Sequence, residues 1–91
     1  MPVRSDGLYA KKTLTRLVRE MVLESEHSAK QVAKQIGKPY STLLRELNLF
    51  DNGAKLGAET LLEIMKVTGD MQPLEFMARE LGFGLVRHED A

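Results

Sequence analysis

The chain has no cysteine and no tryptophan, and aromatic residues make up only 5% of its 91 residues. Without cysteine, neither a disulfide framework nor a thiolate zinc site can form. No apolar run approaches the roughly 18 residues that a membrane-spanning helix needs. The first residues also lack the apolar core of a secretory signal. These absences predict one soluble, cytoplasmic domain that does not associate with a membrane.

Residues suited to catalysis or metal binding are also scarce. The two histidines, His27 and His88, are far apart in the sequence, and neither has a partner at metal-ligand spacing. Asp51 and Asn52 open a short loop that lacks the alternating carboxylates and terminal glutamate of a calcium-binding EF-hand. We therefore expect no enzymatic activity, no cofactor and no bound metal.

The net charge is zero, but the two halves of the chain differ in sign. Residues 1–50 hold nine Lys and Arg against five Asp and Glu, a balance of +4, and residues 51–91 hold four against eight, a balance of −4. Because salt screens charges beyond about 10 Å, the local balance matters more to an anionic partner than the total. The N-terminal half is therefore the candidate surface for a nucleic acid, although uneven halves also occur in proteins without such a partner.

The pattern of apolar residues predicts an all-α fold. Apolar positions recur at spacings of three and four residues, and no segment alternates as a strand would. Five short helices are expected, at residues 9–25, between Ser28 and Gly37, and at residues 40–48, 58–68 and 74–81. Residues 1–8 are predicted to form a flexible arm, residues 9–84 the domain, and residues 85–91 a charged tail.

Each predicted helix has an apolar side for the core. The first helix carries one apolar stripe, formed by Ala10, Leu14, Leu17, Val18, Met21 and Val22. The third carries Tyr40, Leu43, Leu44 and Leu47 within about 100° of a helical wheel. In the helix at residues 58–68, apolar residues including Leu62 cover most of the circumference, which indicates a central, well-buried helix.

The segment Ser28–Asn48 is the most informative part of the chain and reads SAKQVAKQIGKPYSTLLRELN. Ser28 and Gln31 have the spacing of a capping box, which starts a helix. Gly37 suits a helix end, and Pro39 suits the first turn of the next helix. Two helices joined in this way, with small Ala33 at their approach, are typical of a helix-turn-helix, whose second helix enters the DNA major groove. An ordinary helical hairpin in a bundle is the alternative.

The second helix of this segment has a polar face that suits DNA. Arg45 can donate two hydrogen bonds to a guanine edge, and Ser41 and Thr42 can bond to base edges or phosphates. Lys38, at the turn, is placed for a phosphate. Alternatively, Arg45 pairs with a nearby acid and Asn48 caps the helix end. The candidate DNA-binding residues are Lys38, Tyr40, Ser41, Thr42, Arg45 and Asn48.

These residues resemble a known family. The stretch GKPYSTLLRELN resembles the recognition segment of Cro/repressor-type helix-turn-helix domains, through Gly37, Ser41, Thr42, Leu43 and Arg45. Together with DNGAKLGAETLLEIMKVTGD and PLEFMARELGF, it is similar to the phage regulatory protein CII family over residues 28–84.

The resemblance implies a five-helix, lambda-repressor-like helix-turn-helix domain. Such a domain would bind operator or promoter DNA in the bacterial host cell and regulate transcription, controlling a lysis–lysogeny promoter of a phage or prophage. Glu46 stands where repressor-like domains commonly carry a bulky apolar residue, so Leu47 is expected to take that packing role.

The expected partners are double-stranded DNA and further copies of the chain. A single short recognition helix makes few base contacts, and specific binders usually double the site through two-fold symmetry. We therefore expect a homodimer or higher homo-oligomer formed through the fifth helix, where Leu74, Ala78 and Leu81 share a stripe. Phe76 and Phe83 either join that surface or complete the core. RNA polymerase is a further candidate partner, and the alternative function is a protein–protein interaction adaptor or antirepressor on the same scaffold.

Overall fold

A computed structural model of the protein describes residues 13–51 and 53–90, and this part of the chain contains five α-helices, one 3-10 turn and no strand. The helices are α2 (Thr13–Glu24), α3 (Ala29–Ile36), α4 (Tyr40–Glu46), α5 (Ala58–Thr68) and α6 (Gln72–Glu80), followed by the 3-10 turn η1 (His88–Asp90). The all-α prediction is confirmed for these residues. The expected arm at residues 1–8 and the expected start of the first helix at residues 9–12 lie outside them, as does Asn52.

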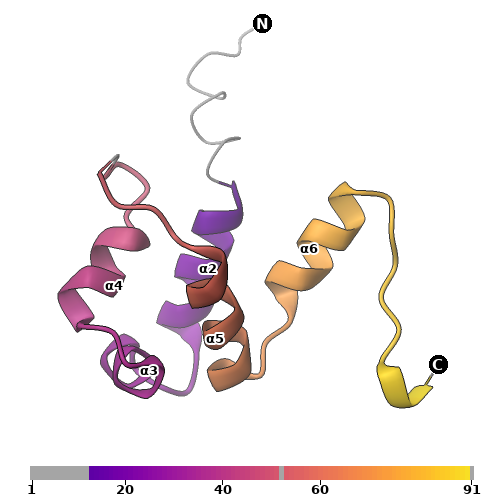
Figure 1. The fold of residues 1–91 in the computed structure, drawn as a ribbon, viewed down its shortest axis with the longest axis horizontal. Helices are drawn as coiled ribbons and strands as arrows, with labels where there is room; N and C mark the ends of the chain where they lie inside the picture. Colours follow the sequence, from indigo (N-terminus) through magenta and orange to yellow (C-terminus); the bar gives the residue numbers. More distant parts are fainter. Residues whose placement is uncertain (1–12, 52, 91) are drawn as a thin grey trace, which may run out of the picture.

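Four of the helices gather on one side of the molecule and α6 lies on the other (Figure 1). Helix α3 packs against both α4 and α5, and α2 packs against α3, α5 and α6. Beyond α6 the chain continues as an extended segment that ends in η1. No helix in the described part of the chain is long and apolar enough to cross a membrane.

Local interactions set the start and end of α3 as the sequence predicts. The Ser28 hydroxyl accepts a hydrogen bond from the Gln31 backbone N–H at 3.2 Å, and the Gln31 side chain accepts from the Ser28 N–H at 3.1 Å. Gly37 has a φ of +75°, which glycine adopts without strain. The N–H groups of Gly37 and Lys38 bond back to the carbonyls of residues 34 and 33 at 3.2 and 3.0 Å, as in a Schellman motif. The capping box and the glycine stop are therefore confirmed.

One apolar core joins α2, α3, α4 and α5. Its buried members are Val18, Met21, Val22, Val32, Ala33, Leu43, Leu47, Leu61, Ile64 and Met65. Ala33 is 1% exposed, as expected of a small residue where two helices approach closely. Leu47 is 2% exposed, which confirms that it fills the core beside Glu46. The α3–α4 unit is thus fixed to the body of the protein by apolar packing.

Two leucines that the helical pattern assigned to the core are largely outside it. Leu44 is 41% exposed and Leu62 is 48% exposed, so the prediction that they face the core is wrong. Leu44 lies about 100° around α4 from Leu43, and the short helix α4 docks through the narrower stripe of Leu43 and Leu47. Helix α5 is buried on one side only.

Helices α4 and α6 also have boundaries that differ from the prediction. Helix α4 ends at Glu46 rather than Asn48, because the Asn48 side chain accepts a hydrogen bond from the Phe50 N–H at 2.9 Å and turns the chain. Helix α6 begins at Gln72 rather than Leu74, after Asp70 accepts the Gln72 N–H at 3.0 Å. It ends at Glu80, one residue before the predicted end.

Candidate nucleic-acid interface

The outer face of α4 is polar and open to solvent. Ser41 and Arg45 are exposed on α4, Thr42 is half-buried beside them, and exposed Asn48 follows the helix. The opposite side of the helix carries Leu43, which is fully buried. The helix therefore presents short hydroxyl side chains and a long guanidinium on a rigidly held support.

Lys38 is engaged by an acid of α4. Its ammonium donates to both carboxylate oxygens of Glu46 at 2.9 Å, and the two side chains are 24% and 14% exposed. This ion pair ties the turn before α4 to the last turn of the helix. An ammonium has three N–H donors, so one is left for another acceptor. The phosphate contact of Lys38 stays a prediction, made by a group that already has a partner.

Arg45 pairs with Asp51 in the loop after α4. The Arg45 Nε donates to Asp51 Oδ2 at 3.1 Å, while the arginine side chain is still 62% exposed. Asp51 Oδ1 accepts the Gly53 backbone N–H at 2.9 Å. The hydrogen bond from Arg45, followed by that from Gly53, holds the pKa of the Asp51 carboxyl below its ordinary value of 3.8. The acid pairing considered for Arg45 is therefore present, and it leaves most of the arginine side chain open to solvent.

Tyr40 and Asn48 lie at opposite ends of α4. The Tyr40 ring is 39% exposed and has the Lys30 ammonium 5.8 Å from its centroid, a cation–π distance. The side-chain oxygen of Asn48 accepts a hydrogen bond from the Phe50 N–H. It therefore stabilises the turn after the helix, close to the capping role considered for it. Whether either residue touches DNA stays a prediction.

A shallow pocket borders the C-terminal end of α4. It has a volume of about 240 Å³ and is lined by Arg19, Leu23, Ala29, Leu44, Leu47 and Asn48. Leu44 and Leu23 are 41% and 55% exposed, so an apolar rim adjoins the polar face of α4. Sequence reasoning missed Leu44 as a surface residue and Asp51 as the partner of Arg45. The sequence alone does not indicate which acidic residue pairs with Arg45, and only the folded loop identifies it as Asp51.

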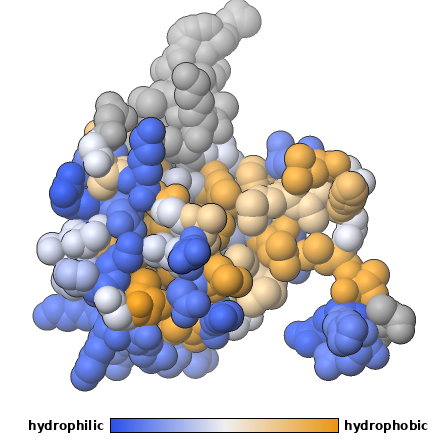
Figure 2. Space-filling model, viewed as in Figure 1, coloured by the Kyte–Doolittle hydropathy of each residue, from blue (hydrophilic) through white to orange (hydrophobic). Residues whose placement is uncertain are grey.

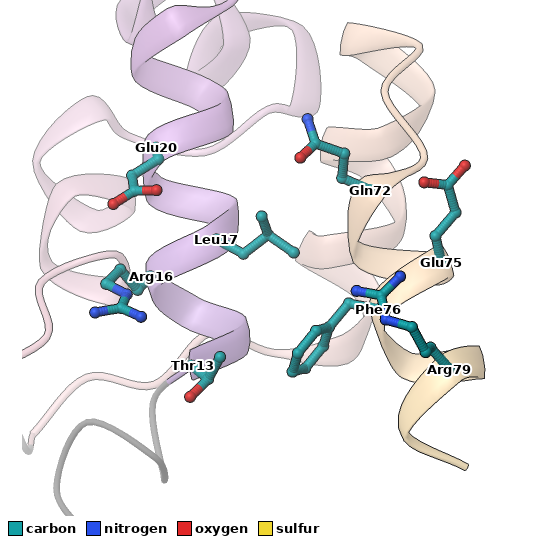
Figure 3. Close-up of a pocket in the computed structure, with 8 residues that line it drawn as sticks. All are labelled: Thr13, Arg16, Leu17, Glu20, Gln72, Glu75, Phe76 and Arg79. Carbon is teal, nitrogen blue, oxygen red and sulfur yellow. The ribbon is translucent and has the colours of Figure 1, made fainter. Parts of the chain in front are cut away.

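A second hollow, of about 210 Å³, lies between α2 and α6 (Figure 3). Leu17 and Phe76 point into the space between the two helices, and side chains of both signs, including Glu20 and Arg79, surround it. No group of three or more side chains that could hold a metal ion occurs among the described residues. This hollow is the junction through which α6 joins the body.

An apolar surface covers α6 and the segment after it (Figure 2). We define the C-terminal apolar surface by its exposed members, which are Leu74, Leu81, Phe83, Leu85 and Val86. Phe83 is 64% exposed, so the interpretation that it completes the core is wrong, whereas Phe76 is half-buried against α2. Contiguous apolar patches on soluble proteins commonly mark interaction sites.

Residues 12–91 match the family model of phage regulatory protein CII (CP76). The chain belongs to this family. The match confirms the resemblance seen in residues 28–84 and extends it over most of the chain. No curated protein and no solved structure matches the sequence. The protein is thus a member of a family of phage regulatory proteins, with an all-α described structure.

Proposed function

We propose that this phage regulatory protein is a sequence-specific DNA-binding transcriptional regulator. In this proposal α3 and α4 form a lambda-repressor-like helix-turn-helix, and α4 enters the major groove of an operator or promoter. The protein would act in the cytoplasm of the bacterial host and control a lysis–lysogeny promoter. The observation that carries the proposal is the polar outer face of α4, on a short helix anchored by buried Leu43 and preceded by the left-handed Gly37.

The contacts divide by side-chain chemistry. Arg45 donates to a guanine edge, and Ser41 and Thr42 bond to base edges or nearby phosphates. The remaining predicted contacts, Lys38, Tyr40 and Asn48, go to phosphate oxygens, which position a protein without reading sequence. Lys38 contributes less than a free lysine would, because Glu46 holds its ammonium.

Leu44 adds an apolar contact to this set. It is 41% exposed and directly precedes Arg45 on α4, beside the pocket rim. The C5-methyl group of thymine is the one apolar feature of the major groove, and aliphatic side chains recognise it by contact. We therefore include Leu44 as a reader of thymine next to the guanine.

A second copy of the chain covers the C-terminal apolar surface in this proposal. A seven-residue helix supplies few base contacts, and two-fold pairing would place two such helices in half-sites about 34–36 Å apart. The exposed Leu81 and Phe83 supply the apolar area for pairing. The acidic residues of the C-terminal half leave RNA polymerase as a candidate partner of the DNA-bound oligomer.

The test is a fluorescence anisotropy titration with two duplexes of equal length across a salt series. One duplex carries the intergenic DNA beside the gene, and the other is a scrambled sequence of the same composition. The proposal expects tighter binding to the intergenic duplex and a steep salt dependence, with a slope near 0.9 for each phosphate neutralised. Absence of binding to either duplex at low salt would overturn it and favour the adaptor or antirepressor.

A further inference from the structure

The carboxylate of Asp51 uses its two oxygens for two different tasks. Oδ1 accepts the Gly53 N–H at 2.9 Å, so the carboxylate is held by its own loop. Oδ2 accepts the Nε–H of Arg45 at 3.1 Å, so the same carboxylate holds the guanidinium. Asp51 is only 24% exposed, whereas Arg45 is 62% exposed. The acid is therefore the fixed partner, and the arginine reaches past it into solvent.

This geometry determines which donors of Arg45 are left. A guanidinium has five N–H donors, one on Nε and four on the two terminal nitrogens. Among the described residues, its one hydrogen bond uses Nε. A β-carbon at Gly53 would lie 3.5 Å from Arg45 Nη2, so the loop packs directly against the guanidinium. The pair of terminal nitrogens is the part that can face a guanine, which presents O6 and N7 as neighbouring acceptors.

We infer that Asp51 is a positioning residue for base reading, which holds Arg45 through Nε so that its two terminal nitrogens meet O6 and N7 of one guanine. The inference rests on the proposed function and names one base that the protein reads. An exposed arginine loses side-chain freedom when it binds. The Asp51 hydrogen bond imposes part of that restriction before DNA arrives, which is preorganisation.

The same carboxylate has a second effect on DNA binding. Its negative charge lies beside the DNA-facing arginine and opposes the attraction to phosphates. Asp51 therefore weakens the electrostatic attraction to every DNA sequence, and it adds a favourable contribution only where the sequence has guanine at the position that Arg45 reads. A residue that merely stabilised the loop would not affect guanine preference and general affinity in opposite directions. Loosening the loop would weaken binding to every sequence.

The experiment is selection from a randomised duplex library, followed by sequencing of the bound fraction. It compares the wild-type chain with Asp51→Asn, Arg45→Ala and the double variant. Asparagine retains an oxygen for the Gly53 N–H and removes the charge. The matched control is Asp70→Asn, because Asp70 also accepts an N–H two residues ahead, from Gln72 at 3.0 Å, but lies between α5 and α6. Thermal unfolding followed by circular dichroism checks each fold, and Asp51→Ser replaces Asp51→Asn if the latter unfolds.

We expect the wild-type protein to select a motif with a guanine that Arg45→Ala no longer selects. Asp51→Asn should reduce that same preference roughly tenfold, within the range for one bidentate base contact, without weakening binding to unrelated DNA. The double variant should match Arg45→Ala, and Asp70→Asn should match the wild type.

Three results would overturn the inference in distinguishable ways. A wild-type protein that selects no motif removes the proposed function, and the inference with it. An unchanged guanine preference in Asp51→Asn removes the role of Asp51 and leaves the regulator intact. A further loss of selectivity in the double variant shows that Asp51 does not act through Arg45.

Discussion

The two ends of this molecule differ in the kind of side chain that they present to solvent. Around α3 and α4, two ion pairs form, Lys38 with Glu46 and Arg45 with Asp51. Around α6 and the segment after it, large apolar side chains lie in solvent, and Leu81 is 76% exposed. The α3–α4 end is thus marked by its paired charges, and the α6 end by its larger share of exposed apolar side chains.

This difference suits the two ends to different functions, base reading at one and pairing between copies at the other. Reading a base edge needs donors held at fixed positions, because ordering a free side chain on binding costs entropy. Pairing between copies needs apolar area, because water release drives it without demanding exact donor positions. The α3–α4 end has the first property and the C-terminal apolar surface has the second. The following predictions test that division.

The largest effect is expected where α4 is anchored. Leu43 is fully buried, so Leu43→Ala should lower the free energy of unfolding by about 2–5 kcal/mol through lost contacts and a cavity. Urea unfolding followed by circular dichroism measures this change. Leu44→Ala is the matched control and should cost less than about 1 kcal/mol, because that neighbour is 41% exposed. Equal losses would contradict the one-sided docking of α4.

The apolar end should control assembly. Leu81→Ser should weaken self-association by about 1.5–3 kcal/mol per copy, the value of burying one leucine. Sedimentation equilibrium measures the dissociation constant. Leu23→Ser, which changes a leucine 55% exposed on α2, should leave self-association unchanged. A wild-type chain that stays monomeric at all concentrations would rule out a second copy as the occupant of this surface.

The polar end should control site-selective binding. Arg45→Ala should weaken binding to the selected site by about 1–3 kcal/mol and relax its base preference at one position. Fluorescence anisotropy at one salt concentration measures this loss. Arg79→Ala removes the same charge from an exposed position on α6 and should have little effect on selectivity. If both variants lose affinity equally, Arg45 acts only as a general positive charge.

Lys38→Ala should weaken binding to all sequences by a similar factor and reduce the salt slope by about 1. The loss should be modest, because Glu46 already holds the ammonium. Lys66→Ala on α5 is the control for charge, since Lys66 is 64% exposed and pairs with Glu63 at 3.5 Å. A loss confined to one base position would assign Lys38 to base reading instead.

The smallest effect concerns pH. Because Arg45 lowers the pKa of Asp51 below 3.8, the ion pair contributes stability above that value and loses it as pH falls through the lowered pKa. The stability difference between the wild type and Asp51→Asn should therefore be constant from about pH 6 to 8 and shrink only in strong acid. Urea unfolding at several pH values measures it. A change in that difference near neutral pH would contradict the assignment.

Several features of this protein were determined by the sequence alone. The Ser28 capping box, the Gly37 stop and the bounds Ala58–Thr68 of α5 all follow from residues within one or two turns of each other. Such short-range signals act through backbone hydrogen bonds and caps, which hardly depend on the rest of the fold. The polar face of α4 also follows from the sequence, because side chains repeat around a helix with a fixed period.

Tertiary structure alone decided how much of each apolar helix face is buried and which acidic residue pairs with which basic residue. Leu43 and Leu44 are both leucines on one side of α4, and only the neighbouring helices determine that the first is buried and the second is not. The partner of Arg45 lies six residues away, beyond the end of α4. The partner of Lys38 lies eight residues away, at the other end of α4. Such pairings depend on where the helices stop and how they pack, because a side chain contacts only what the folded chain brings within reach.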